Sequence, residues 1–100
     1  MSPDPDILRQ LVALLARLYD ETDGFAENPG DAQLWYNRGY ANGMVRALTE
    51  LGQAEAVASR ISVDPEDVIA GHALMAWGKA YLHGAETGYR ETFEVLPAEE

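Results

Sequence analysis

The stretch DAQLWYNRGYANGMVRALTELG, residues 31–52, decides the fold. Its first residue, Asp31, is a favourable helix N-cap, because a short carboxylate can accept a hydrogen bond from an unpaired N–H group of the first turn. Its last residue, Gly52, favours the left-handed conformation in which many helices end. The stretch therefore predicts one long helix.

The predicted helix has one apolar face and one face of unusual composition. The apolar face predicts core and comprises Leu34, Tyr40, Ala41, Met44, Val45, Leu48 and Leu51. The other face carries five residues that we call the bare stripe: Trp35, Gly39, Asn42, Gly43 and Arg46. Each glycine inside a helix costs about 0.8–1 kcal/mol relative to alanine. Two glycines on one stripe therefore indicate that another segment packs closely against the helix backbone.

Two interpretations of the bare stripe follow. The more common one is that another helix of the same fold crosses it at the glycines. The functional one is that it binds a partner protein, with Trp35 as the anchor and Arg46 at the edge, because Trp and Arg are enriched in interface hot spots. Residues 32–49 also contain no acidic residue, in a chain whose net charge is −10. The bare stripe is therefore our candidate partner-binding site.

The composition restricts the class of protein. A chain of 100 residues with 47% hydrophobic content predicts a single folded domain and argues against intrinsic disorder. The absence of cysteine excludes disulfides and thiolate metal sites. The apolar run at residues 11–16 is too short to span a bilayer, and the acidic start lacks the basic region of a signal peptide. We therefore expect a cytoplasmic protein without a membrane segment.

The charge bears on the partners. Seventeen acidic residues against seven basic ones would repel nucleic acid, so we expect no direct nucleic-acid binding. The same charge allows the opposite role, in which a compact acidic protein mimics nucleic acid and occupies a basic groove of another protein.

Apolar residues at helical spacing, bounded by Pro, Gly and Asp, predict four further helices. The first begins at Asp4-Pro5-Asp6 and ends near Thr22, and the others cover residues 53–60, 65–83 and 86–96. Gly84 is expected to end the helix at 65–83, which we expect to be the most buried one, with Gly71 and Gly78 at a close contact. The predicted fold is an all-α, single-domain bundle of four to five helices over residues 1–100, with loose ends at 1–4 and 97–100.

No pattern in the sequence indicates catalysis. It contains no nucleophile–base arrangement, no phosphate-binding glycine loop and no HExxH motif. His72 and His83 fall on one helix face, but about 16 Å apart along its axis, too far to share a metal ion. The acidic residues between 20 and 31 lack the ligand spacing of a calcium loop. We therefore expect no enzyme, no metal site and no cofactor.

Residues 54–71, AEAVASRISVDPEDVIAG, resemble a helix-turn-helix unit. Ala58 matches the small residue of the first helix, residues 62–64 the turn, and Val68 the core residue of the second helix. The resemblance implies a DNA-binding regulator. However, the turn lacks the usual glycine, and the second helix opens with Pro65-Glu66-Asp67, which offers no side chain that reads base edges. We interpret the segment as a structural helix pair.

The size, the charge and the WYNRGYANGMVRAL stretch resemble the small acidic helical proteins that phages and mobile elements encode. This resemblance implies a compact inhibitor or adaptor that binds and blocks a host macromolecular complex, including by nucleic-acid mimicry. Our leading hypothesis is accordingly a non-enzymatic protein-binding domain. The hypothesis leaves open whether this domain is a monomer or a homodimer. A small-molecule binder is an alternative, with a pocket among Trp35, Tyr36, Tyr40, Trp77 and Tyr81. A DNA-binding regulator is the other alternative.

Overall fold

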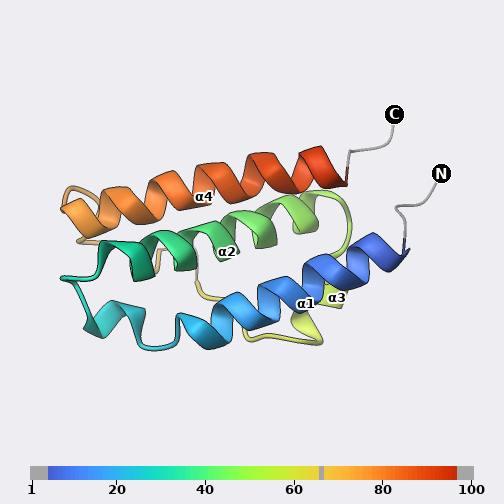
Figure 1. Ribbon diagram of the computed structural model, residues 1–100, viewed down its shortest axis with the longest axis horizontal. Helices are drawn as coiled ribbons and strands as arrows, with labels where there is room; N and C mark the ends of the chain where they lie inside the picture. The colour runs from blue at the N-terminus through green and yellow to red at the C-terminus, as the bar shows by residue number, and fades with distance from the viewer. Residues whose placement is uncertain (1–4, 66, 97–100) are drawn as a thin grey trace.

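The computed structural model describes residues 5–65 and 67–96, and within these ranges every regular element is helical (Figure 1). The elements are α1 (Pro5–Glu21), the short 3-10 helix η1 (Phe25–Glu27), α2 (Ala32–Glu50), α3 (Ala54–Ala58) and α4 (Ala76–Val95). The predicted all-α bundle is confirmed. The predicted loose ends, and Asp4 as the N-cap of α1, lie outside the described residues.

The predicted ends of α2 are confirmed. The Asp31 side chain accepts a hydrogen bond from the Leu34 N–H group at 3.0 Å, as an N-cap does. Gly52 has a φ of 82°, the left-handed conformation that ends a helix. The central stretch of the sequence therefore forms the helix that its two terminal residues specify.

α2 lies in the middle of the bundle, between α1 and α4 (Figure 1). α1 runs antiparallel to α2, whereas α4 runs parallel to it. Because α2 and α4 point the same way, the chain between them must return along the length of the molecule. Residues 51–75 make this return and carry α3 at its start. We call residues 59–75 the crossover.

The prediction for residues 65–96 is wrong in three respects. Residues 67–74 form turns rather than helix, with hydrogen bonds from Ala70 N–H to Asp67 and from His72 N–H to Ile69. Over the described residues 67–74, the second helix of the helix-turn-helix resemblance is therefore absent. Gly84 does not end a helix but lies in the middle of α4. Gly71 is outside the helix with a φ of 87°, so of the expected glycine pair only Gly78 is at a close contact.

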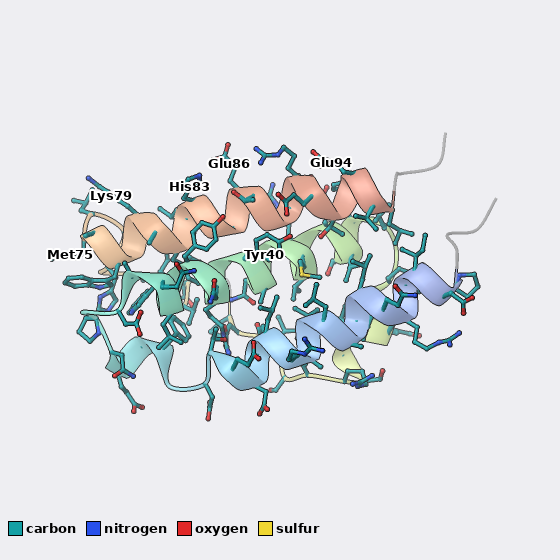
Figure 2. All side chains as sticks on the ribbon, viewed as in Figure 1. Tyr40, Met75, Lys79, His83, Glu86 and Glu94 are labelled. Atoms are coloured by element: carbon teal, nitrogen blue, oxygen red, sulfur yellow. The ribbon has the colours of Figure 1, made fainter. Side chains whose placement is uncertain are left out.

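α4 is also not the most buried helix. Lys79 and Glu94 project from α4 on the side away from α2 (Figure 2). The apolar residue Leu82 on the same helix is 47% exposed. The most buried helix is α2, which is covered by α1 on one side and by α4 on the other.

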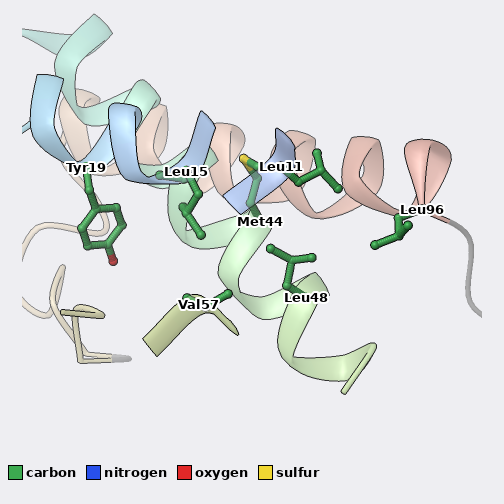
Figure 3. Packing of buried hydrophobic residues seen from close by; sticks show 8 residues of the cluster. Leu11, Leu15, Tyr19, Met44, Leu48, Val57 and Leu96 are labelled. Carbon is green, nitrogen blue, oxygen red and sulfur yellow. The ribbon is translucent and has the colours of Figure 1, made fainter. Parts of the chain in front are cut away.

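The core consists of two clusters. The larger one joins α1, α2, α3 and the end of α4, and its buried members are Leu11, Leu15, Tyr19, Ala41, Met44, Leu48, Val57 and Leu96 (Figure 3). The smaller one comprises Phe25, Trp35 and Tyr81. Full burial of an aliphatic or aromatic side chain contributes about 1.5–3 kcal/mol, so these clusters hold the helices in place. Among the described helices, none is long and apolar enough to cross a membrane.

Candidate functional site

α2 and α4 make a close backbone contact at four glycines: Gly39, Gly43, Gly84 and Gly88. A Cβ atom added to Gly39 would lie 2.0 Å from the carbonyl oxygen of Tyr81. A Cβ atom added to Gly84 would lie 2.1 Å from the carbonyl oxygen of Tyr36. The helix backbones therefore touch, at a distance that only glycine permits.

The contact has an approximate local twofold symmetry. Gly39 faces Tyr81 while Gly84 faces Tyr36, and Gly88 faces Tyr40 in the same manner. Both helices carry the pattern Tyr-x-x-Gly-x-x-x-Gly, at residues 36–43 and 81–88. Such small residues let two helices approach closely enough for Cα–H groups to contact carbonyl oxygens. The pattern is a signal by which the sequence could have revealed the α2–α4 pair.

Three residues of the bare stripe are inside the fold. Trp35 is fully buried, where its ring packs edge-on against Phe25 and its Nε1–H group donates to the Asn28 carbonyl at 3.1 Å. Gly39 and Gly43 are buried under α4. Trp35 and Gly39 therefore pack against other parts of the same chain, and Gly43 packs against α4 while also bordering the open space between α2, α4 and the crossover.

The other two residues of the bare stripe lie at the side of the α2–α4 pair. The side chain of Arg46 is 72% exposed and donates to Glu50 at 3.3 Å. Arg46 also stacks on the ring of Tyr89, 4.7 Å from its centroid. The Tyr89 hydroxyl donates to the same Glu50 carboxylate at 2.7 Å. Asn42 is half-buried and belongs to an internal polar network.

That network is centred on an ion pair between Arg38 on α2 and Asp64 in the crossover. The guanidinium donates two hydrogen bonds to the carboxylate, at 2.8 and 3.0 Å. It donates two more, to the Tyr19 carbonyl at 2.9 Å and to the Thr22 hydroxyl at 3.0 Å. The guanidinium also lies 3.7 Å from the centroid of the Tyr19 ring. The ion pair therefore fixes the crossover to both α1 and α2.

Asn42 extends the network to α4. Its Nδ2 donates to Asp64 and to the Tyr81 hydroxyl, both at 2.8 Å. Its Oδ1 accepts a short hydrogen bond from the Tyr19 hydroxyl, which accepts in turn from the Asp64 N–H group at 3.0 Å. Both hydrogens and the oxygen of the Asn42 amide are thus engaged within the protein.

The network shifts the ionisation of its members. Burial alone would raise the pKa of Asp64, but the hydrogen bonds from Arg38 and Asn42 and the charge of Arg38 hold it below the ordinary value of 3.8. Burial would lower the pKa of Arg38, whereas its pairing with Asp64 raises it overall. Burial raises the pKa of Tyr19 to about 12. Asp64 and Arg38 are therefore both charged at neutral pH and form an ion pair.

Above this network an open groove of about 890 Å³ runs between α2, α4 and the crossover. Its lining residues are Asn42, Gly43, Val45, Arg46, Thr49, Glu50, Val63, Asp64, Pro65, Tyr81, Leu82, Ala85, Glu86 and Tyr89. Asn42, Asp64 and Tyr81 bring the internal network to the groove. Leu82 and Val63 are 47% and 43% exposed. Three bare-stripe residues, Asn42, Gly43 and Arg46, thus line a groove that the sequence did not predict.

The aromatic residues that the sequence suggested for a small-molecule pocket do not gather around this groove. Of Trp35, Tyr36, Tyr40, Trp77 and Tyr81, only Tyr81 lines it. Tyr40 instead donates to Glu91 at 2.5 Å, and Trp77 donates to the His72 ring at 3.1 Å. Within residues 5–65 and 67–96, no three His, Asp or Glu side chains are placed to hold a metal ion.

In comparisons with known proteins, no protein family, no curated protein and no solved structure matches this chain.

Proposed function

We propose that this chain is a non-enzymatic protein-binding domain, of the inhibitor or adaptor type, that holds its partner in the groove between α2 and α4. The observation that supports the proposal is the half-exposed apolar wall of this groove. Leu82 on α4 and Val63 in the crossover both line it, and both leave nearly half of their surface in water. A partner that covers them would gain the free energy of burying apolar surface.

The polar groups of the groove support a protein partner over a small molecule. A small-molecule site usually offers a few unsatisfied polar groups that orient the ligand. Here the amide of Asn42 and the carboxylate of Asp64 are already engaged by Arg38 and Tyr19 inside the protein. Recognition in this groove therefore depends on shape, apolar contact and rim charge, as in a protein–protein interface.

Site-specific photo-crosslinking in the source cells tests the proposal. A photoreactive amino acid replaces Leu82, inside the groove, or Leu74, which is 87% exposed and outside it. We expect a defined protein adduct from position 82 and none from position 74. Adducts of equal yield from both positions, or from neither, would contradict binding in the groove.

A further inference from the structure

We infer that the segment bound in the groove is a basic amphipathic helix of the partner protein, about two turns long. This inference rests on the proposed function and specifies the partner's chemistry. It depends on three properties of the groove: its length, the hydrogen bonding of the backbone groups in its walls, and the charges at its rim.

The length of the groove matches two helical turns. Its walls extend from Asn42 to Glu50 along α2 and from Tyr81 to Tyr89 along α4. At 1.5 Å per residue, each wall is about 12 Å long. A helix of two turns presents apolar anchors at positions i, i+3 or i+4, and i+7 over this length. Val45, Leu82 and Ala85 are the apolar side chains that such anchors would contact.

The walls favour a helix over an extended segment. An extended peptide binds by pairing its backbone N–H and C=O groups with a free edge of its receptor. Two sides of this groove are the helices α2 and α4, whose interior backbone groups already pair within each helix. On the third side, in the crossover, the Asp64 N–H group already donates to the Tyr19 hydroxyl and Pro65 has no N–H group to donate. A helix satisfies its own backbone and needs only side-chain contacts, so it can bind where an extended segment would leave backbone groups unpaired.

The charges select a basic partner. Glu86 lies at the rim, and its side chain projects into solvent (Figure 2). The one basic residue at the rim, Arg46, is paired with Glu50 and stacked on Tyr89, so its charge is offset locally. The whole chain carries a net charge of −10. A second copy of this chain would bring the same charge and be repelled, whereas Lys or Arg beside the apolar anchors would be attracted.

Three synthetic peptides test the inference. Each has about 15 residues, enough to form a helix on binding, and the same leucine spacing. The remaining positions carry Lys in the first peptide, Gln in the second and Glu in the third. Affinity is measured by fluorescence anisotropy, and the binding site is mapped by amide chemical shifts in NMR spectra of the full chain.

We expect the Lys peptide to bind at least about ten times more tightly than the Glu peptide, with the Gln peptide between them. The amide shifts should concentrate at residues 42–50, 63–65 and 81–89. Equal affinities for the three peptides would overturn the inference. So would binding of the Lys peptide that shifts only the acidic turns between residues 20 and 31.

Two pairs of matched variants separate apolar from charged contacts. Leu82→Gln should weaken the Lys peptide about tenfold, whereas Leu74→Gln should leave its affinity unchanged. Glu86→Gln should weaken it up to about fivefold, and more than Glu27→Gln, which removes an equal charge outside the groove. Equal effects within either pair would contradict binding in the groove.

Failure of this inference can be told apart from failure of the proposed function. If position 82 yields a defined protein adduct and no Lys peptide binds, the inference fails while the proposed function stands. If positions 82 and 74 crosslink equally, the proposed function itself fails.

Discussion

Gly39 on α2 lies against the Tyr81 carbonyl of α4, so closely that a Cβ atom at this position would be 2.0 Å from the carbonyl oxygen. Backbone atoms, unlike the end of a flexible side chain, cannot rotate out of the way. The contact therefore sets the separation of α2 and α4, and with it the shape of the groove beside them.

Substitution of Gly39 by alanine should force the two helices apart. We expect Gly39→Ala to lower the free energy of unfolding by at least about 2–3 kcal/mol, the upper range for overpacking, because this contact involves backbone. Denaturant unfolding measures the effect. Gly30→Ala is the matched control, since a Cβ atom there meets nothing within 4 Å, and it should change stability by less than about 1 kcal/mol. Equal effects of the two substitutions would contradict the close contact.

Removal of the Asp64 carboxylate should leave the Arg38 charge buried without its partner. The side chains of Arg38 and Asp64 are only 9% and 14% exposed. Asp64→Ala should therefore destabilise the protein by about 3 kcal/mol, as when one partner of a buried pair is removed. Glu94→Ala, which breaks the exposed pair with Arg90, should cost less than about 0.5 kcal/mol. A small and similar cost for both variants would show that Asp64 does not hold the crossover.

Because the pKa of Asp64 is lowered in the folded protein, we expect the free energy of unfolding to depend on pH in the acidic range. The pKa of Asp64 is lower in the folded protein than its ordinary value of 3.8. Its contribution is therefore fully present above pH 3.8 and is lost as the pH falls through the lower folded pKa. In denaturant unfolding at decreasing pH, the stability difference between the wild type and Asp64→Asn should shrink below pH 3.8. A difference that stays constant in this range would contradict the lowered pKa.

Tyr19 and Tyr40 should ionise late in an alkaline titration. Burial, aided at Tyr40 by the hydrogen bond to Glu91, raises the pKa of both residues from 10.0 to about 12. Their neutral forms therefore stabilise the fold fully below pH 10.0, and this contribution is lost as the pH rises through about 12. In an ultraviolet titration of tyrosinate, Tyr19→Phe and Tyr40→Phe should each remove one late-ionising group. If either substitution instead removed a tyrosine that ionises near pH 10.0, the raised pKa of that residue would be wrong.

Local signals made α2 predictable. The cap at Asp31 and the stop at Gly52 act within one turn of the helix ends, so the residues themselves specify the boundaries. Gly84, like Gly52, is a glycine that was expected to end a helix, yet α4 continues through it. The difference is tertiary, because Gly84 lies against the backbone of α2 at Tyr36.

The groove and its polar floor could not be predicted in the same way. Asp64 belongs to the predicted turn before residues 65–83, but its carboxylate binds Arg38 on α2. The groove exists because α2 and α4 run parallel with the crossover beside them. The repeated Tyr-x-x-Gly-x-x-x-Gly pattern indicates that the two helices pack together, but no local pattern encodes their parallel direction or the position of the crossover. Arg38 was the only signal of this network in the sequence. A charged side chain in a helix that is buried on two sides requires a buried acidic partner.

The most direct test of the groove is the affinity of the crosslinked partner for two matched variants. Calorimetry with the purified partner would compare Leu82→Gln with Leu74→Gln, after thermal unfolding has shown that both variants are folded. If the groove binds the partner, Leu82→Gln should weaken binding at least about tenfold and Leu74→Gln should leave it unchanged. Equal affinities of both variants and the wild type would contradict partner binding in the groove.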